Sequence, residues 1–313
     1  MVKKDFKFPS ADGKTDIYGV IWIPDTNPIA ILQISHGVTE YILRYEKFAE
    51  YLTSRGFVVV GNDDLGHGYS IAPNSAPMYF GPKGSWEWAV KDLHTCYTLT
   101  KKQFPDIPYC LLGFSMGSFL VRHFLINYPN DVDAAILMGT GQMASLSLKL
   151  GLAVANSEAK KFGEDKPTPK IDSLTFDNYN KIFAPTRTRY DWLCSSNEAI
   201  DKYIAEPLRG KSFSSGLFRE LLSGMAFTSK QKNIAKMNIN LPILLVSGDK
   251  DPVGGCGKGV KRTYDSFKKA GIHEVSIKLY PNLRHDILHE DCYERVYSDF
   301  YKWMLDKLLT KNV

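Results

Sequence analysis

The chain has 313 residues, and its 39 lysines and arginines outnumber its 34 aspartates and glutamates, which gives a net charge of +5. Apolar residues make up 44% and charged residues 23%, a composition that excludes a disordered or fibrous chain and can fill a sizeable core. The positive charges form no long tract, so the sequence lacks the basic patch or stripe of a nucleic-acid-binding protein, and no nucleic-acid partner is expected.

Short apolar runs alternate with amphipathic segments over most of the chain, a pattern that predicts an α/β fold. We expect strands at residues 17–23, 29–34, 57–61, 109–112 and 134–138, separated by helices at residues 45–54, 86–104 and 116–128. The pattern resumes with strands at residues 241–247 and 275–280 and helices at residues 260–270 and 293–309. Apolar strands separated by helices indicate a mostly parallel sheet with helices on both faces.

The alternation is interrupted in the middle of the chain. Between residues 143 and 235 the sequence predicts helices, scattered prolines and clustered aromatic residues, but no clear strand. The simplest interpretation is one α/β core, residues 1–142 and 236–313, that carries a helical cap inserted at residues 143–235.

The sequence predicts a cytoplasmic protein. We find no apolar stretch with the length of a signal peptide or of a membrane-spanning helix. The cysteines are scattered and contain no CxxC pair, which favours free thiols over a disulfide framework or a cysteine zinc site. They are Cys96, Cys110, Cys194, Cys256 and Cys292.

The segment Gly113-Phe114-Ser115-Met116-Gly117 lies where a predicted strand ends and a predicted helix begins. A serine in this position occupies a sharp turn that exposes its hydroxyl, and the flanking glycines avoid clashes with neighbouring elements. The start of the following helix offers unpaired N–H groups to a developing oxyanion. We therefore predict that Ser115 is a nucleophile; the alternative is a glycine-rich turn with a structural serine.

A serine nucleophile requires a histidine base that an acid orients, and after this type of turn the chain order is serine, acid, histidine. Asp251 is the predicted acid because it lies further beyond its strand end than the alternative, Asp249. His285 is the predicted base because it follows a strand at the carboxyl edge, where open α/β sheets bind ligands. The histidines interpreted as structural are His36, His67, His94 and His123.

His285 and His289 also have the HxxxH spacing that places two imidazoles on one helix face, as in zinc hydrolases. However, no glutamate follows the first histidine and no third ligand is evident. We predict no metal and no cofactor. Cys256 lies five residues after Asp251, and we hypothesise that it borders the site, with a solvent-exposed loop thiol as the alternative.

Four segments give the chain a resemblance to a known family: residues 35–40 followed by Arg44-Tyr45, residues 64–70, residues 248–251, and Arg284-His285. They resemble the HGxxEH…RY segment, the DxxGHGxS loop, and the acid and base loops of the α/β-hydrolase superfamily. The similarity is greatest to its monoglyceride lipase and lysophospholipase branch, which also contains serine aminopeptidase-like hydrolases. Tyr41 stands where the branch usually has a histidine, and Val38-Thr39 replaces smaller residues.

The resemblance implies an α/β-hydrolase fold and an oxyanion hole made by the backbone N–H groups of Val38 and Met116, with His36 and Gly37 shaping the first loop. It implies that the DxxGHGxS loop is structural and braces the catalytic loops. Apolar cap residues are candidates for an acyl-chain pocket: Leu146, Leu150, Phe183, Trp192, Leu217 and Leu221. The outer face of the cap is a candidate for peripheral membrane contact.

Together these features predict a metal-independent serine carboxylester hydrolase. The expected substrate is a small lipid-like monoester, such as a monoacylglycerol or a lysophospholipid. The alternatives are an aminopeptidase or amide hydrolase of the same fold, a non-catalytic binding protein of the same fold, and a metallohydrolase.

Overall fold

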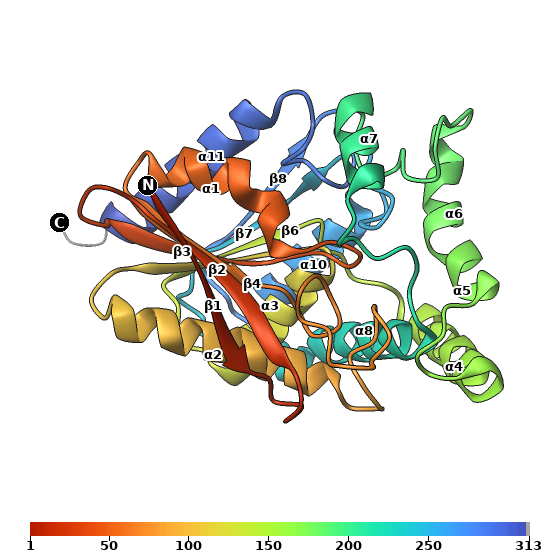
Figure 1. The fold of residues 1–313 in the computed structure, drawn as a ribbon. Coiled ribbons are helices and arrows are strands. Elements are labelled where there is room, and N and C mark those ends of the chain that lie inside the picture. Colours follow the sequence, from red (N-terminus) through yellow and green to blue (C-terminus); the bar gives the residue numbers. More distant parts are fainter. Residues whose placement is uncertain (311–313) are drawn as a thin grey trace.

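The computed structural model describes residues 1–310 of the chain. An eight-stranded sheet lies at the centre of this part (Figure 1). The strand order is β1-β2-β4-β3-β5-β6-β7-β8. β1 and β2 pair with each other and β2 pairs with β4 in antiparallel fashion, whereas all other pairs are parallel. The strands are β1 (Val2–Pro9), β2 (Asp16–Ile23), β3 (Ala30–Ser35), β4 (Phe57–Asn62), β5 (Tyr109–Phe114), β6 (Ala134–Met138), β7 (Ile243–Gly248) and β8 (Val275–Tyr280).

Helices cover both faces of the sheet, as predicted. One face carries α1 (Glu46–Thr53), after a short 3₁₀ turn at Ile42–Tyr45, and α11 (Tyr293–Leu309); the other carries α2 (Trp86–Gln103), α3 (Met116–Asn127) and α10 (Lys258–Lys269) (Figure 1). Successive side chains of a strand point to opposite faces. Leu111 of β5 therefore packs in the cluster of α2, α3 and α10, and Leu112 packs in the cluster of α1 and α11.

The sequence did not predict β1. This strand lies at the edge of the sheet and is mostly exposed, so it contains lysines and no continuous apolar run. Its pairing with β2 places the Phe6 ring directly over Gly19, where a Cβ would lie 2.4 Å from the ring. In the sequence only Phe6 and Phe8 indicate this strand, because its other residues form no hydrophobic pattern.

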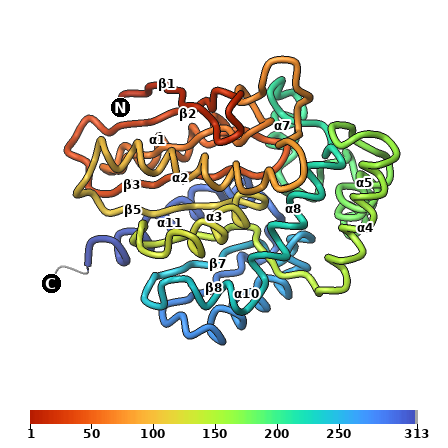
Figure 2. The backbone as a smooth tube through the Cα atoms, turned by 90° about the horizontal axis from the view of Figure 1, so that it is seen from below, coloured from red at the N-terminus to blue at the C-terminus, as the bar shows by residue number. Residues whose placement is uncertain are grey.

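The segment between β6 and β7 is helical, and we call residues 143–235 the insertion. Figures 1 and 2 both show α4 to α7 at the end of the molecule opposite the N-terminus. α8 packs against α3 and α4, and Gly224 of α8 lies against Trp86. The helices are α4 (Ser145–Phe162), α5 (Pro169–Leu174), α6 (Phe176–Asn180), α7 (Asn197–Ala205), α8 (Ser215–Thr228) and α9 (Gln231–Ile234).

None of the helices within residues 1–310 combines the length and the apolar character needed to cross a membrane. The predicted second part of the core, residues 236–313, ends in three residues, 311–313, that lie outside the described part of the chain.

Candidate active site

Ser115 occupies the tight turn between β5 and α3. Its backbone has φ 50° and ψ −115°, a strained conformation for a residue other than glycine. A Cβ on Gly113 would lie 2.4 Å from the carbonyl oxygen of Gly117, and a Cβ on Gly117 would lie 2.1 Å from that of Ser35. The turn is therefore packed backbone against backbone, which explains why glycine is needed on both sides of the serine.

His285 and Asp251 meet beyond the ends of β8 and β7. His285 Nδ1 lies 2.9 Å from Asp251 Oδ2, and both side chains are buried. Asp251 also accepts hydrogen bonds from the Ser247 hydroxyl at 2.7 Å and from the Val253 N–H at 2.9 Å. Burial alone would raise the pKa of Asp251, but His285 and these hydrogen bonds lower it below its usual value. The carboxylate is thus ionised and can hold a proton on His285 Nδ1.

The His285 ring is held between two aromatic rings. Its centroid lies 4.8 Å from that of Phe114 and 5.2 Å from that of Trp192. Gly139 at the end of β6 has φ 60°, and a Cβ there would lie 2.8 Å from His285 Cε1. Gly139 therefore leaves the space that the imidazole fills, a role that we did not predict from the sequence.

Ser115 and His285 line one small cavity. Its volume is about 10 Å³, which leaves room for roughly one water molecule. Among the cavity residues that the sequence reasoning predicted are Ser115, His285, Val38 and Trp192; those it missed are Phe114, Thr39, Glu40, Leu193, Tyr203 and Asp286. Phe114, Thr39 and Glu40 lie inside the quoted motifs, whereas no motif marks Leu193 or Tyr203.

The loop after β3 carries Val38, and His36 orients it. The Asp64 N–H donates to His36 Nε2 at 2.9 Å, so the ring proton is on Nδ1, which lies 2.7 Å from the Gly37 carbonyl oxygen and donates to it. Burial lowers the pKa of His36 to about 3, so the ring stays neutral. Because a trans peptide directs its C=O and N–H to opposite sides, this bond sets the direction of the Val38 N–H.

The loop of Val38 and the start of α3 both present backbone N–H groups near Ser115. The Gly37 N–H donates to Glu40 Oε1 at 2.6 Å, and the Val38 N–H has no acceptor among residues 1–310. Met116 is the first residue of α3, where an N–H has no partner within the helix. Asp64 belongs to the DxxGHGxS loop, so its hydrogen bond to His36 joins that loop to the loop that carries Val38.

The insertion reaches the cavity through Trp192, Leu193 and Tyr203. It is tied to the loop that carries His285, because the Asp286 N–H donates to the Leu193 carbonyl oxygen at 2.6 Å. Arg284 also donates to the Asp191 carbonyl oxygen.

The structure does not bring all the predicted acyl-pocket residues to this cavity. Leu217 is fully buried and Leu221 partly buried in the main core cluster, and Phe183 packs under the Arg284 guanidinium at 4.2 Å from the ring centroid. Leu146 and Leu150 are 68% and 61% exposed on α4.

The alternative site residues lie elsewhere. Asp249 accepts the Asn282 N–H at 2.8 Å in a neighbouring loop. His289 Nδ1 lies 2.9 Å from Asp286 Oδ1, and its Nε2 lies 3.2 Å from the Arg44 carbonyl oxygen. Cys256 is exposed and is not among the described residues that line the cavity of Ser115.

Comparisons with known proteins identify the family. A family model described as serine aminopeptidase, S33 (Hydrolase_4) matches residues 26–292, which is most of the chain. The chain belongs to this family of α/β hydrolases.

Individual relatives are similar over nearly the whole chain. It is 26% identical over 311 residues to a monoacylglycerol lipase of Mycolicibacterium smegmatis, covering 98% of each chain. It is 24% identical over 286 residues to the monoglyceride lipase of Mus musculus, covering 90% of this chain and 83% of the mouse protein.

Solved structures share the architecture. The chain superposes on a thermostable carboxyl esterase from Bacillus coagulans with a TM-score of 0.91, at 24% identity, covering 99% of this chain and 100% of that one. A monoglyceride lipase from Saccharomyces cerevisiae gives a TM-score of 0.74 at 15% identity, covering 99% of this chain and 97% of the yeast chain. These similarities confirm the predicted α/β-hydrolase fold.

Proposed function

We propose that this family member is a serine carboxylester hydrolase that cleaves lipid-like monoesters, of the monoacylglycerol lipase or lysophospholipase type. The main support is the 2.9 Å contact between Asp251 and His285 in a buried site whose cavity Ser115 also lines. The names of the monoacylglycerol lipase relatives favour the substrate class.

In the proposed mechanism, Ser115 Oγ attacks the ester carbonyl carbon while His285 Nε2 accepts the hydroxyl proton. Asp251 holds the proton on Nδ1 and stabilises the imidazolium. When the tetrahedral intermediate collapses, the alcohol takes the proton from Nε2 and leaves an acyl-enzyme. A water molecule then attacks the acyl carbon with His285 as the base, which releases the fatty acid and regenerates the serine.

The N–H groups of Val38 and Met116 are the proposed donors to the oxyanion. Two pre-oriented donors in a buried site can lower the barrier by several kcal/mol, about 3 for one donor in well-studied serine proteases. The neutral His36 ring supports this role because it sets the direction of the Gly37–Val38 peptide before the substrate arrives. Preorganised donors cost no reorganisation at the moment of reaction.

We further propose that the insertion acts as a cap over Ser115. The cavity walls contributed by Phe114, Trp192 and Leu193 are apolar, which suits an acyl chain. Its volume of about 10 Å³ is far below the roughly 300 Å³ of a typical ligand pocket, so the cap must shift to admit an ester. The exposed Leu146 and Leu150 support contact between the outer face of α4 and a lipid surface rather than a lining role.

The proposal is tested by fluorophosphonate labelling of the wild type and of Ser115→Ala, each with and without EDTA. We expect labelling of the wild type that EDTA does not change, no labelling of the variant, and a fall of kcat by roughly 10⁴- to 10⁶-fold. A folded wild type that takes no label would refute the proposal. Rates on monoacylglycerol, lysophospholipid and aminoacyl-amide substrates then distinguish a lipid esterase from an aminopeptidase.

A further inference from the structure

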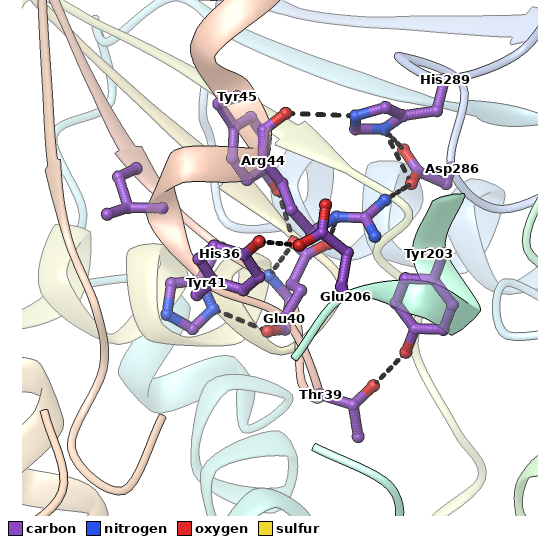
Figure 3. Close-up of polar contacts among 12 residues, drawn as sticks. His36, Thr39, Glu40, Tyr41, Arg44, Tyr45, Tyr203, Glu206, Asp286 and His289 are labelled. Atoms are coloured by element: carbon purple, nitrogen blue, oxygen red, sulfur yellow. Dashed lines mark hydrogen bonds and ion pairs between the residues drawn. The ribbon is translucent and has the colours of Figure 1, made fainter. Parts of the chain in front are cut away.

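Tyr203 of α7 is the only aromatic hydroxyl among the described residues that line the Ser115 cavity. The side chain is buried, and its Oη lies 2.7 Å from Thr39 Oγ1 (Figure 3). Thr39 Oγ1 in turn donates to the Val38 carbonyl oxygen at 2.6 Å. Because a threonine hydroxyl has a single hydrogen, Tyr203 must be the donor in the first contact. Two consecutive hydrogen bonds therefore run from Tyr203 of the insertion through the Thr39 hydroxyl to the Val38 carbonyl oxygen.

This chain acts on a strained part of the loop. Thr39 has φ 64°, a left-handed conformation that is unusual for a β-branched residue. Such a conformation persists only where the surrounding structure holds it. The His36 bond sets the peptide before Val38, and the Thr39 hydroxyl sets the peptide after it. The hydroxyl that makes the second restraint is itself held by Tyr203 of the insertion.

Tyr203 has a second contact with the same region. The Arg44 guanidinium lies between Glu40 and Asp286, with Nε 3.3 Å from Glu40 Oε2 and Nη2 3.2 Å from Asp286 Oδ2 (Figure 3). The Tyr203 ring covers this buried guanidinium at 4.6 Å. Glu40 holds the Gly37 N–H, and Asp286 follows His285 in the chain. Arg44 thus joins the loop that carries Val38 to the loop that carries His285.

We infer that Tyr203 is a positioning residue through which the insertion holds residues 36–40, the oxyanion loop, in their active geometry. The inference rests on the proposed function, since it takes Val38 as an oxyanion donor. The insertion must shift to admit an ester, and α7 would then withdraw the Tyr203 hydroxyl from Thr39. The loop has its full set of contacts only while Tyr203 again meets Thr39 beside the bound ester, so the position of α7 and catalytic competence are coupled.

The test measures kcat and KM for p-nitrophenyl butyrate, and the rate of fluorophosphonate labelling, in Tyr203→Phe, Thr39→Val and the double variant. Tyr203→Phe removes the donor to Thr39, and Thr39→Val removes the hydroxyl that joins Tyr203 to Val38. Both changes break the same chain, so we expect kcat and labelling to fall about tenfold, less than for loss of a direct oxyanion donor, with KM unchanged. The double variant should be no slower than Thr39→Val, because that change already removes both hydrogen bonds of the chain. Thr39→Ser, which keeps the hydroxyl, should retain wild-type kcat.

Tyr190→Phe is the matched control. Tyr190 is another buried tyrosine of the insertion, with its ring centroid 5.3 Å from that of Tyr203, but its hydroxyl contacts Arg209 at 3.1 Å and the Lys211 carbonyl oxygen at 3.5 Å. We expect kcat within twofold of the wild type. Melting temperatures of all variants identify any that fail to fold, and Thr39→Val tests the same chain from the core side.

Several outcomes would overturn the inference. Wild-type kcat in Tyr203→Phe, additive losses in the double variant, or a change confined to KM would exclude a positioning role, and the last result would make Tyr203 a substrate contact. If the wild type hydrolyses no ester and takes no label, the proposed function fails and the inference fails with it. An active wild type matched by an equally active Tyr203→Phe removes only the inference.

Discussion

Two glycines show how differently the turn of Ser115 and helix α4 of the insertion are packed. A Cβ on Gly117, in the turn of Ser115, would lie 2.1 Å from the backbone oxygen of Ser35. A Cβ on Gly151, in α4 of the insertion, would meet only the end of the Leu222 side chain, at 2.9 Å. Backbone cannot move aside without displacing a strand, whereas a leucine can change rotamer. The turn of Ser115 therefore has one permitted arrangement, whereas the contact at Gly151 of α4 can adjust.

The polar contacts follow the same division. Asp251 and His36 are fully buried in the core, and each is held by hydrogen bonds from residues near strand ends. The insertion meets the site through the backbone oxygens of Asp191 and Leu193 and through the hydroxyl of Tyr203. In the proposed function, the core carries the chemistry and the insertion regulates access to it.

The largest effect should come from Asp251, the proposed acid of the core. In Asp251→Asn the amide no longer holds the proton on His285 Nδ1, so we expect kcat for p-nitrophenyl butyrate to fall by about 10⁴-fold. Asp249→Asn is the matched control, because the Asp249 side chain accepts a hydrogen bond from the Asn282 N–H, away from His285, and kcat should stay within about twofold of the wild type. A variant pair with the opposite pattern would assign the acid to Asp249.

The two glycines give the second largest effect. Gly117→Ala must displace the Ser35 carbonyl, so we expect a loss of about 3 kcal/mol or more in the free energy of unfolding, together with reduced activity. Gly151→Ala should change stability by less than about 1 kcal/mol, since alanine favours the helix and Leu222 can move. Thermal and urea unfolding measure both variants, and equal losses in the two would contradict the contrast between the regions.

The sequence alone was informative where chemistry depends on strand ends. Ser115, Asp251 and His285 each follow a parallel strand, and the carboxyl ends of parallel strands meet at one edge of the sheet. The rule predicts that the three residues lie near one another. In the structure Asp251 lies 2.9 Å from His285, and Ser115 and His285 line the same cavity. The glycines of the turn could be predicted because the Gly-x-Ser-x-Gly pattern marks a strand–turn–helix junction, where side chains beside the serine would clash with neighbouring elements.

The sequence was less informative where the answer depends on how separate segments pack. Leu146 and Leu150 have the spacing of one helix face, but spacing does not tell whether that face turns toward Ser115 or toward solvent. Tyr203 reaches Thr39 only because α7 folds back over the strand ends, a long-range contact that no local pattern indicates. Gly139 was missed for the same reason, since its Cβ would meet a ring from a distant loop.

A third prediction concerns acid stability and the core loop after β4. Burial lowers the pKa of His67 to about 4, against about 6.5 in an unfolded chain. The folded state therefore lacks a proton that the unfolded state binds between these values, so this contribution to stability is complete above pH 6.5 and is lost as the pH falls toward 4. Between pH 7 and 5 the loss from His67 alone amounts to about 2 kcal/mol.

Replacing the histidine tests this contribution. His67→Gln should unfold with a weaker dependence on pH between 7 and 5 than the wild type, whatever its stability at pH 7. Chemical unfolding at the two pH values measures the difference, and His273→Gln, at an exposed position, reports the general effect of losing a histidine. Parallel pH curves for His67→Gln and the wild type would show that His67 does not bind the extra proton on unfolding.

The smallest effect is expected on the outer face of the insertion, and it distinguishes lipid contact from substrate binding. Leu146→Ser combined with Leu150→Ser removes two exposed apolar side chains, so stability and the hydrolysis of p-nitrophenyl butyrate should not change. Activity on monoacylglycerol presented in vesicles should fall by a few-fold, because less apolar surface enters the lipid interface. Leu148→Ser on the same helix replaces a side chain that is 4% exposed and should instead lower the melting temperature. If the double variant loses activity on the small soluble ester as well, α4 turns these leucines toward Ser115 during catalysis, and the insertion moves further than a cap that merely opens and closes.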